Sequence, residues 1–209
     1  MKRCFIYSAG TFYGLREQPQ PGDYLIAADA GLLLCRRLGL EPGLVIGDFD
    51  SMPQPDDEPT VRVPVEKDDT DTMLAIRAGL NTGCTEFHFY GATGGRRLDH
   101  TLANLQSLAF LRRHGARGYV YDDCFVYTVI ENETLTVRQT VPWGLLSIFN
   151  LESPASGVTL RGVQYELTDA ALDSGFPIGV SNHILASQAE IIVRSGLLLV
   201  GWELPALEI

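Results

Sequence analysis

The chain has 209 residues, enough to bury a core as one large domain or as two smaller ones. Its 26 aspartate and glutamate residues outnumber its 16 lysine and arginine residues, and the formal net charge of −10 disfavours nucleic acid and anionic membrane as partners. No apolar run approaches the ~20 residues that span a bilayer, the N-terminal run is too short for a signal peptide, and the four cysteines form no CxxC pair, so we expect a cytoplasmic protein.

Short apolar runs alternate with helical patterns in the first part of the chain. The expected strands are residues 4–10, 24–31, 44–51, 61–66 and 86–92. The expected helices are residues 31–40, 70–83 and 98–115. The spacing in the last one predicts an apolar stripe of Leu98, Leu102, Leu105 and either Leu108 or Ala109. This alternation indicates an α/β domain whose mostly parallel sheet is covered on both faces.

After Tyr121 the pattern changes to β-rich runs broken by Gly, Pro, Asn and Ser, and only residues 168–175 indicate a helical turn. We therefore expect two domains: an N-terminal α/β domain over residues 1–122 and a smaller all-β domain over residues 123–209, either a sandwich or a barrel, of which the family resemblance described below implies the sandwich.

Four polar segments follow strands of the first domain. They are AADAG at 27–31, GDFDS at 47–51, EKDDTD at 66–71 and GATGGRRLDH at 91–100. Because ligands bind at the carboxyl ends of parallel strands, all four segments are predicted to meet at one edge of the sheet.

In the second segment, Asp48 and Asp50 are separated by one residue. On a strand they would project to the same side about 6–7 Å apart, a spacing that a divalent cation can bridge. The alternative is an acidic turn in which Asp48 and Ser51 bond to nearby backbone groups.

The glycine-rich segment has a different chemistry. The backbone amides of Gly94 and Gly95 and the following helix N-terminus can face an anion, and an arginine can add bidentate contacts to phosphate oxygens. The alternative is a tight turn with Asp99 in the first turn of the helix. No GK[ST] follows, so this is not a Walker A motif.

Other polar residues lie close to these segments. Lys67 and Thr70 flank the third one, where Thr70 or Asp69 is also a candidate N-cap of the next helix. Asn104 lies one helical turn after His100 and shares its face. Carboxylates for Mg²⁺, basic side chains and backbone amides together match the requirements of phosphoryl transfer.

The ordered set of motifs resembles the thiamine pyrophosphokinase family. The resemblance rests on the four segments above and on GVSNH at 179–183, and it covers most of the chain. It implies an enzyme that transfers the pyrophosphoryl group of ATP to the hydroxyl of thiamine, with Mg²⁺, giving thiamine diphosphate and AMP. It also implies a nucleotide-binding first domain, a thiamine-binding second domain and a homodimer whose active site lies at the subunit interface.

The resemblance implies roles for individual residues. Asp48, Asp50 and Asp71 would hold Mg²⁺ and orient the triphosphate, Asp29 would support the metal, and Asp99 would act near the thiamine hydroxyl or the metal. Further residues are expected to bind ATP: Lys67, Thr70, Gly94, Gly95, Arg96 and Asn104.

On the thiamine side, Ser181 and Asn182 match a family motif, and Trp202 is placed where an aromatic ring could stack. The alternatives are a turn for Ser181 and Asn182 and a core position for Trp202. The family pattern has a single arginine before Leu-Asp-His, whereas this chain has both Arg96 and Arg97. We favour Arg97 as the phosphate ligand, because its spacing to Asp99 fits the pattern.

Two other functions remain open. A strand followed by DxDS superficially resembles the haloacid-dehalogenase signature, which would make Asp48 the nucleophile of a phosphatase or phosphotransferase; trapping a phospho-aspartate would identify it. A thiamine or nucleotide sensor without turnover is the third possibility, although Asp48, Asp50, Asp71 and Asp99 are all present.

Overall fold

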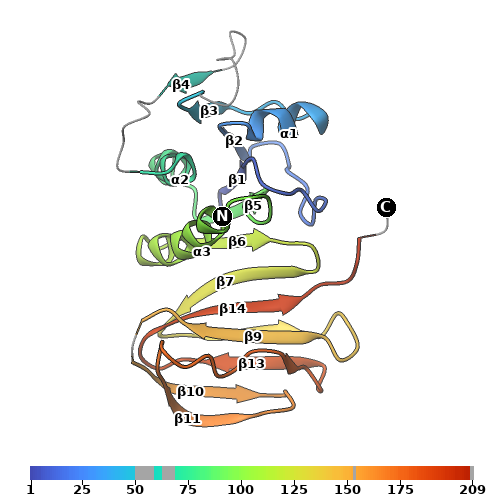
Figure 1. Ribbon diagram of the computed structural model, residues 1–209, viewed down its shortest axis with the longest axis vertical. Coiled ribbons are helices and arrows are strands. Elements are labelled where there is room, and N and C mark those ends of the chain that lie inside the picture. The colour runs from blue at the N-terminus through green and yellow to red at the C-terminus, as the bar shows by residue number, and fades with distance from the viewer. Residues whose placement is uncertain (50–58, 63–68, 153, 208–209) are drawn as a thin grey trace. The chain divides into compact units, whose positions relative to one another are not determined.

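The computed structural model describes residues 1–49, 59–62, 69–152 and 154–207. The chain divides into two compact units, Met1–Asp123 and Cys124–Ile209, each with its own secondary structure (Figure 1). The fold class is as predicted: an α/β unit with a parallel sheet is followed by a smaller antiparallel β unit. None of the helices in the described ranges has the length and apolarity needed to cross a membrane.

The first unit is a parallel sheet with helices on both faces. Its described strands are β1 (Arg3–Tyr7), β2 (Tyr24–Ala28), β3 (Leu44–Gly47), β4 (Thr60–Arg62), β5 (Glu86–Tyr90) and β6 (Arg117–Tyr121). They lie in the order β6-β5-β1-β2-β3-β4, and every neighbouring pair is parallel. Strand order reverses between β1 and β5, so the carboxyl ends of these two strands flank the point where such sheets bind ligands.

The helices are α1 (Gly31–Arg37), α2 (Asp71–Asn81) and α3 (Leu98–Arg113). Helices α2 and α3 contact each other on one face of the sheet, and α1 packs on the other face (Figure 1). The sheet core consists of apolar side chains such as Phe5, Ile6, Phe87 and Phe89.

The stripe predicted on α3 is wrong at its N-terminal end. Leu98 and Leu102 are exposed, whereas the buried face carries Asn104, Ser107, Leu108 and Leu111. Asn104 can be buried because its Nδ2 donates to the Ala92 carbonyl oxygen at 2.7 Å, and the Ser107 hydroxyl donates to the Asn104 carbonyl oxygen. The spacing of the leucines gives no information about these hydrogen bonds, which allow polar side chains to lie on the buried face of α3.

The second unit is a sandwich of two antiparallel sheets. One has the order β12-β9-β14-β7 and the other β11-β10-β13-β8. The strands are β7 (Phe125–Glu131), β8 (Thr134–Arg138), β9 (Leu145–Asn150), β10 (Ala155–Arg161), β11 (Leu167–Leu172), β12 (Asn182–His183), β13 (Gln188–Ile192) and β14 (Leu197–Glu203). Buried side chains from both sheets, including Ile148, Leu160, Ile191 and Val200, form one core.

Two segments differ from the sequence-based prediction. Residues 168–175, expected to include a helical turn, instead contribute most of β11, which pairs with β10 through an irregular register. Asp169 there has φ +52°, and its N–H donates to the Thr159 hydroxyl, so cross-strand pairing outweighs the local helical tendency. Strand β6 was not predicted at all.

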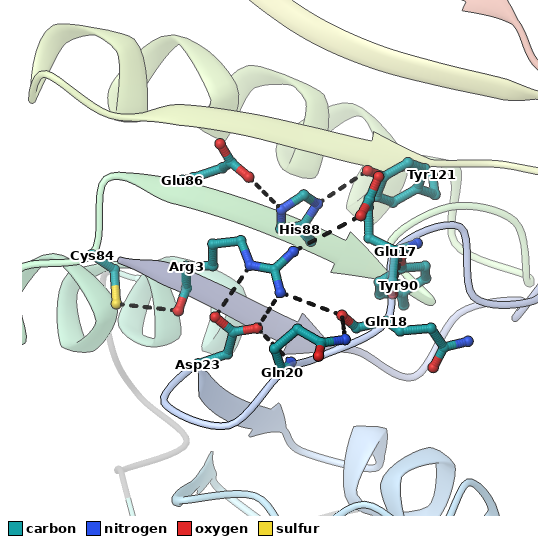
Figure 2. Close-up of polar contacts among 10 residues, drawn as sticks. All are labelled: Arg3, Glu17, Gln18, Gln20, Asp23, Cys84, Glu86, His88, Tyr90 and Tyr121. Carbon is teal, nitrogen blue, oxygen red and sulfur yellow. Dashed lines mark hydrogen bonds and ion pairs between the residues drawn. The ribbon is translucent and has the colours of Figure 1, made fainter. Parts of the chain in front are cut away.

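One face of the first unit's sheet carries a buried polar network (Figure 2). Since Arg3 and Phe5 of β1 pair in register with Glu86 and His88 of β5, strand alternation places all four side chains on one face. His88 Nε2 lies 2.9 Å from a Glu86 oxygen and Nδ1 lies 3.0 Å from the Tyr121 hydroxyl. The tautomer with the proton on Nε2 satisfies both contacts, because the Tyr121 hydroxyl can then donate to Nδ1.

The same network attaches the segment after β1 to the sheet. Arg3 Nε donates to Asp23 at 3.1 Å, and the Tyr90 hydroxyl accepts from the Glu17 N–H at 2.8 Å (Figure 2). The Arg3 guanidinium also lies 5.1 Å from the centre of the Phe5 ring. Residues 17–23 are therefore held against the sheet by charged and aromatic contacts.

We expect His88 to make the stability of the protein depend on pH. Burial lowers the pKa of His88, despite the opposing effect of Glu86. Since the unfolded chain then binds the proton more readily, the free energy of unfolding should fall as the pH drops below about 6.5, by at most about 1.4 kcal/mol per pH unit. Denaturant unfolding of wild type and His88→Gln between pH 5 and 8 measures this contribution.

The variant should be less stable overall but should lack this part of the pH dependence. His114→Gln removes an exposed histidine and is the matched control, expected to keep the wild-type profile. Superimposable pH profiles of wild type and His88→Gln, apart from a constant offset, would show that the buried ring is not responsible.

Candidate functional site

A cavity of about 700 Å³ lies at the carboxyl ends of the parallel strands in the first unit. Segments that follow β1, β2, β3 and β5 line it, together with the first turns of α2 and α3. This volume is within the range of small-molecule sites. The predicted convergence of strand ends at one edge of the sheet is therefore present as a single cavity.

The floor of the cavity depends on two glycines where backbone segments approach closely. After β1, the Gly10 N–H donates to the Gly91 carbonyl oxygen at 2.7 Å, and the Thr11 N–H donates to the Thr93 carbonyl oxygen at 2.8 Å. A Cβ atom on Gly10 would lie 2.4 Å from the Thr93 oxygen, and one on Gly91, whose φ is +65°, would lie 2.3 Å from the Ser8 oxygen. Neither position can hold a larger residue without moving the backbone.

Carboxylates from two strand ends and from the start of one helix form one wall. Asp29 follows β2 and has φ +48°, and its N–H donates to the Ile46 carbonyl oxygen at 2.7 Å. Asp48 follows β3, just before Phe49, whose φ is +58°. A Cβ on Gly47 would lie 3.3 Å from Asp29 Oδ1, so the glycine leaves room for that carboxylate.

The remaining carboxylates belong to the start of α2. Thr70 is the N-cap of this helix, and its hydroxyl accepts from the Met73 N–H at 3.2 Å. Asp71 lies in the first turn, where the helix dipole favours its negative charge. Asp69 bonds to Arg77 Nε at 3.0 Å. Asp71 is thus presented to the cavity at the positive end of a helix.

The opposite wall is the glycine-rich turn between β5 and α3. Gly94 and Gly95 both have positive φ, +69° and +76°, a conformation that directs successive backbone amides to one side. Asn104 of α3 also lines the cavity, but its Nδ2 bonds to the Ala92 carbonyl and so fixes this turn against the helix. His100 lies on the same helix face, as the spacing predicted.

The two arginines of this turn have different surroundings. Arg97 is the N-cap residue of α3, and its guanidinium bonds to the Asp99 carboxylate through Nε at 2.9 and 3.1 Å and through Nη2 at 2.6 Å. This pairing with Arg97 lowers the pKa of Asp99 to about 2. Arg96 makes no hydrogen bond or ion pair with any residue that the structure describes.

The structure brings together most of the predicted residues of the first unit. Those that line the cavity are Asp29, Asp48, Thr70, Asp71, Gly94, Gly95, Arg96, Arg97 and Asn104. Asp99 is not among the lining residues and is exposed beside Arg97. Asp50 and Lys67 lie outside the described residues.

Several lining residues were missed from the sequence, notably Ser8, Ala9 and Gly10 after β1 and Thr93 after β5. The signal was present, because YSAG ends the first strand as the acidic segments end the others. The other strand ends are marked by charged residues, whereas the small residues here carry no charge and only allow close approach of the backbone.

The predicted thiamine-side residues belong to the second unit. Ser181 has φ +58°, and its N–H donates to the Ser147 hydroxyl at 3.0 Å. Asn182 is buried, and its amide both accepts from the Tyr165 N–H and donates to the Tyr165 carbonyl. Trp202 is partly buried and packs against the core of the sandwich. All three thus have structural contacts within their own unit.

The cavity's donor set suits a hard cation. Asp29, Asp48 and Asp71 supply carboxylate oxygens, the ligands that Mg²⁺ prefers, and neighbouring negative charges are relieved by a cation. Among the described residues, no three His, Cys, Asp or Glu side chains gather into a ready-made metal-ligand group. Within the described part of the chain, these carboxylates alone therefore do not form a complete cation site.

Comparison with known proteins identifies relatives over most of the chain. The family model of the thiamin pyrophosphokinase catalytic domain matches residues 19–120, and that of the thiamin pyrophosphokinase vitamin B1 binding domain matches residues 132–198. A thiamine pyrophosphokinase of Bacillus subtilis is 24% identical over 182 residues, 84% of this chain and 85% of that protein.

Solved structures agree in fold. The crystal structure of thiamine pyrophosphokinase from Bacillus subtilis superimposes with a TM-score of 0.87 at 21% identity, over 97% of this chain and 99% of that one. A thiamin pyrophosphokinase family protein from Enterococcus faecalis gives a TM-score of 0.82 at 26% identity, over 98% and 100% of the two chains.

The N-cap geometry of Thr70 leads to a prediction. Thr70→Ala should lower the free energy of unfolding by about 1 kcal/mol, because the Met73 N–H loses its partner, whereas Thr70→Ser should retain most of the stability. Denaturant unfolding of both variants measures this. If Thr70→Ala kept wild-type stability but lost affinity for a phosphate ligand, a binding role would replace the capping role.

Proposed function

This chain belongs to the thiamin pyrophosphokinase family, and we propose that it transfers the pyrophosphoryl group of ATP to the hydroxyl of thiamine, releasing AMP. In this reaction the thiamine oxygen bonds to the β-phosphorus, the bond from that phosphorus to the α-phosphate oxygen breaks, and the hydroxyl proton leaves. One observation carries the proposal: the strand-end cavity has carboxylates on one wall and a glycine-rich turn with two arginines on the other. Phosphoryl transfer depends on positioning and on neutralising phosphate charge, and this combination of groups can supply both.

We assign the acidic wall to metal binding. Asp48, Asp50 and Asp71 would hold Mg²⁺, with Asp29 supporting them; Asp50 follows Asp48 by two residues in the sequence. When bound, the ion would neutralise phosphate charge and orient the triphosphate. The support is that Asp29, Asp48 and Asp71 come from three different segments yet line one cavity.

The opposite wall would bind the phosphates. The amides of Gly94 and Gly95 and one arginine side chain of this turn can donate to phosphate oxygens. We include Lys67 and Thr70 at the start of α2 among the ATP-binding residues. Asn104 would act indirectly, because its amide already holds the Ala92 carbonyl beside the turn.

Asp99 would orient the thiamine hydroxyl or a metal-bound group. A carboxylate with a pKa of about 2 is a weak base, so it stays negatively charged and accepts hydrogen bonds without taking up the proton. Its position in the first turn of α3, beside the cavity-lining Arg97, supports this role.

We assign thiamine recognition to the second unit, through Ser181, Asn182 and Trp202. The match of the vitamin B1 binding domain model to residues 132–198 includes the first two. The burial of Asn182 and its two bonds to the Tyr165 backbone suggest that it shapes the binding surface. Trp202 lies beyond the matched range and is partly buried against the core, so the exposed part of its ring would supply the stacking surface for thiamine.

We further propose a homodimer whose active site is shared between subunits. The support is a set of exposed apolar side chains on the second unit, where Trp143, Tyr165, Phe176 and Leu185 are each at least half exposed. Large apolar side chains with this exposure are candidates for burial in such an interface. Light scattering should give the mass of two chains, and the mass of one chain would refute the dimer.

The four free cysteines support a cytoplasmic location.

The decisive experiment follows a label from the β-phosphorus of ATP into the products. Purified protein incubated with Mg²⁺, thiamine and ATP labelled at the β-phosphorus should give labelled thiamine diphosphate and an equal amount of AMP. Formation of ADP and thiamine monophosphate would instead show that the γ-phosphorus is attacked and would refute pyrophosphoryl transfer. Binding of both substrates without any product would support a sensor.

The metal assignment predicts a second result. Asp48→Asn and Asp50→Asn should each lower kcat by about two orders of magnitude or more while leaving the free energy of unfolding nearly unchanged, because each removes one ligand charge. Glu190→Gln removes a partly buried carboxylate of the second unit that pairs with Arg161, and is the control, with kcat expected within about twofold of wild type. Near-normal turnover in Asp48→Asn or Asp50→Asn would remove that residue from the metal site.

A further inference from the structure

The glycine-rich turn carries two adjacent arginines where the family motif has one, and their contacts differ. The Arg97 guanidinium engages Asp99 through three contacts of 2.6–3.1 Å. These are charge-assisted bonds in a fork geometry, the strong class of side-chain hydrogen bonds. Moving Arg97 to a phosphate would exchange these contacts with Asp99 for contacts with the ligand.

Arg96 makes no comparable contact with any described residue. It lines the cavity, its side chain is exposed, and it forms no ion pair with any described residue. Among the described lining residues, Arg96 and Arg97 are the two arginines, facing the carboxylates of Asp29, Asp48 and Asp71. Since Arg97 is neutralised by Asp99, Arg96 is the described lining arginine whose charge is available to an anionic ligand.

The backbone also separates the two residues. Arg97 is the N-cap residue of α3, so its position is tied to the helix. Arg96 follows two glycines with positive φ, and a Cβ placed on Gly95 would have no atom within 4 Å. Arg96 therefore belongs to the glycine-rich turn, whereas the backbone of Arg97 belongs to the start of α3, although the Arg97 side chain makes no capping hydrogen bond.

We propose that Arg96 binds the triphosphate of ATP and that Arg97 is a positioning residue that holds the Asp99 carboxylate in place. This assignment rests on the proposed function and replaces the sequence-based preference for Arg97 as the phosphate ligand. The two adjacent arginines would then have different roles: one binds the substrate and the other orients a carboxylate.

Equilibrium binding tests the first half. Calorimetric titration of the full chain with ATP and Mg²⁺, without thiamine, should show that Arg96→Ala weakens binding about tenfold or more, because a charge-assisted contact is lost. Arg97→Ala should stay within about threefold of wild type, and Arg96→Lys, which keeps the charge but not the fork, should fall between Arg96→Ala and wild type. A loss in Arg97→Ala equal to or larger than that in Arg96→Ala overturns the assignment.

A double-mutant cycle tests the second half. If Arg97 acts through Asp99, kcat of Arg97→Ala/Asp99→Asn should equal that of Asp99→Asn alone, whereas the losses in Arg96→Ala/Asp99→Asn should multiply. Multiplicative losses for the Arg97 and Asp99 pair would overturn the positioning role. Unfolding free energies of all variants close to that of wild type will show that the comparison concerns the site.

The two proposals can fail separately. Wild-type protein that binds ATP but forms no thiamine diphosphate would refute the proposed function, and the binding comparison of Arg96→Ala with Arg97→Ala would still decide which arginine meets the phosphates. Wild-type protein that does not bind ATP at all would refute the arginine assignment itself.

Discussion

The parallel pairing of β1 with β5 is the constraint on which the site depends. It places the segments after both strands side by side, and the bonds from Gly10 to Gly91 and from Thr11 to Thr93 continue that arrangement beyond the sheet. Because strand order reverses here, no crossover covers the space between the two strand ends. The carboxylates after β2 and β3 and the first turn of α2 then enclose the cavity from the other side.

The charged side chains and backbone amides of the cavity are positioned mainly by local backbone geometry and less by packing between distant elements. Asp29 and Phe49 adopt positive φ, Thr70 caps the helix that presents Asp71, and Gly94 and Gly95 turn the chain before α3. Each of these features involves only a few residues and lies at the end of a strand or at the start of a helix. Positive φ in non-glycine residues is uncommon and costs energy, so its presence at two strand ends beside one cavity fits a functional site.

The order of elements and the acidic strand ends were predictable because they follow from local patterns: apolar runs, helix caps and turn residues. Local patterns could not predict contacts between groups that lie apart in the sequence, or the side-chain geometry at a helix start. Leu98 and Leu102 match a helical stripe, yet the buried face of α3 includes Asn104, which is satisfied by the Ala92 carbonyl. Pairing with β10 made residues 167–172 a strand, and the Arg97–Asp99 ion pair follows from side-chain geometry that spacing alone does not specify.

The bonds that flank the glycine-rich turn also determine how much chain must become ordered when a ligand binds. Gly91 and Thr93 are fixed to the segment after β1, Ala92 is fixed by Asn104, and Leu98 already belongs to α3. Rearrangement can then be confined to Gly94–Arg97. Ordering costs on the order of 1–2 kcal/mol of conformational entropy per residue, so a preorganised frame around these few residues keeps most of the interaction energy available for affinity.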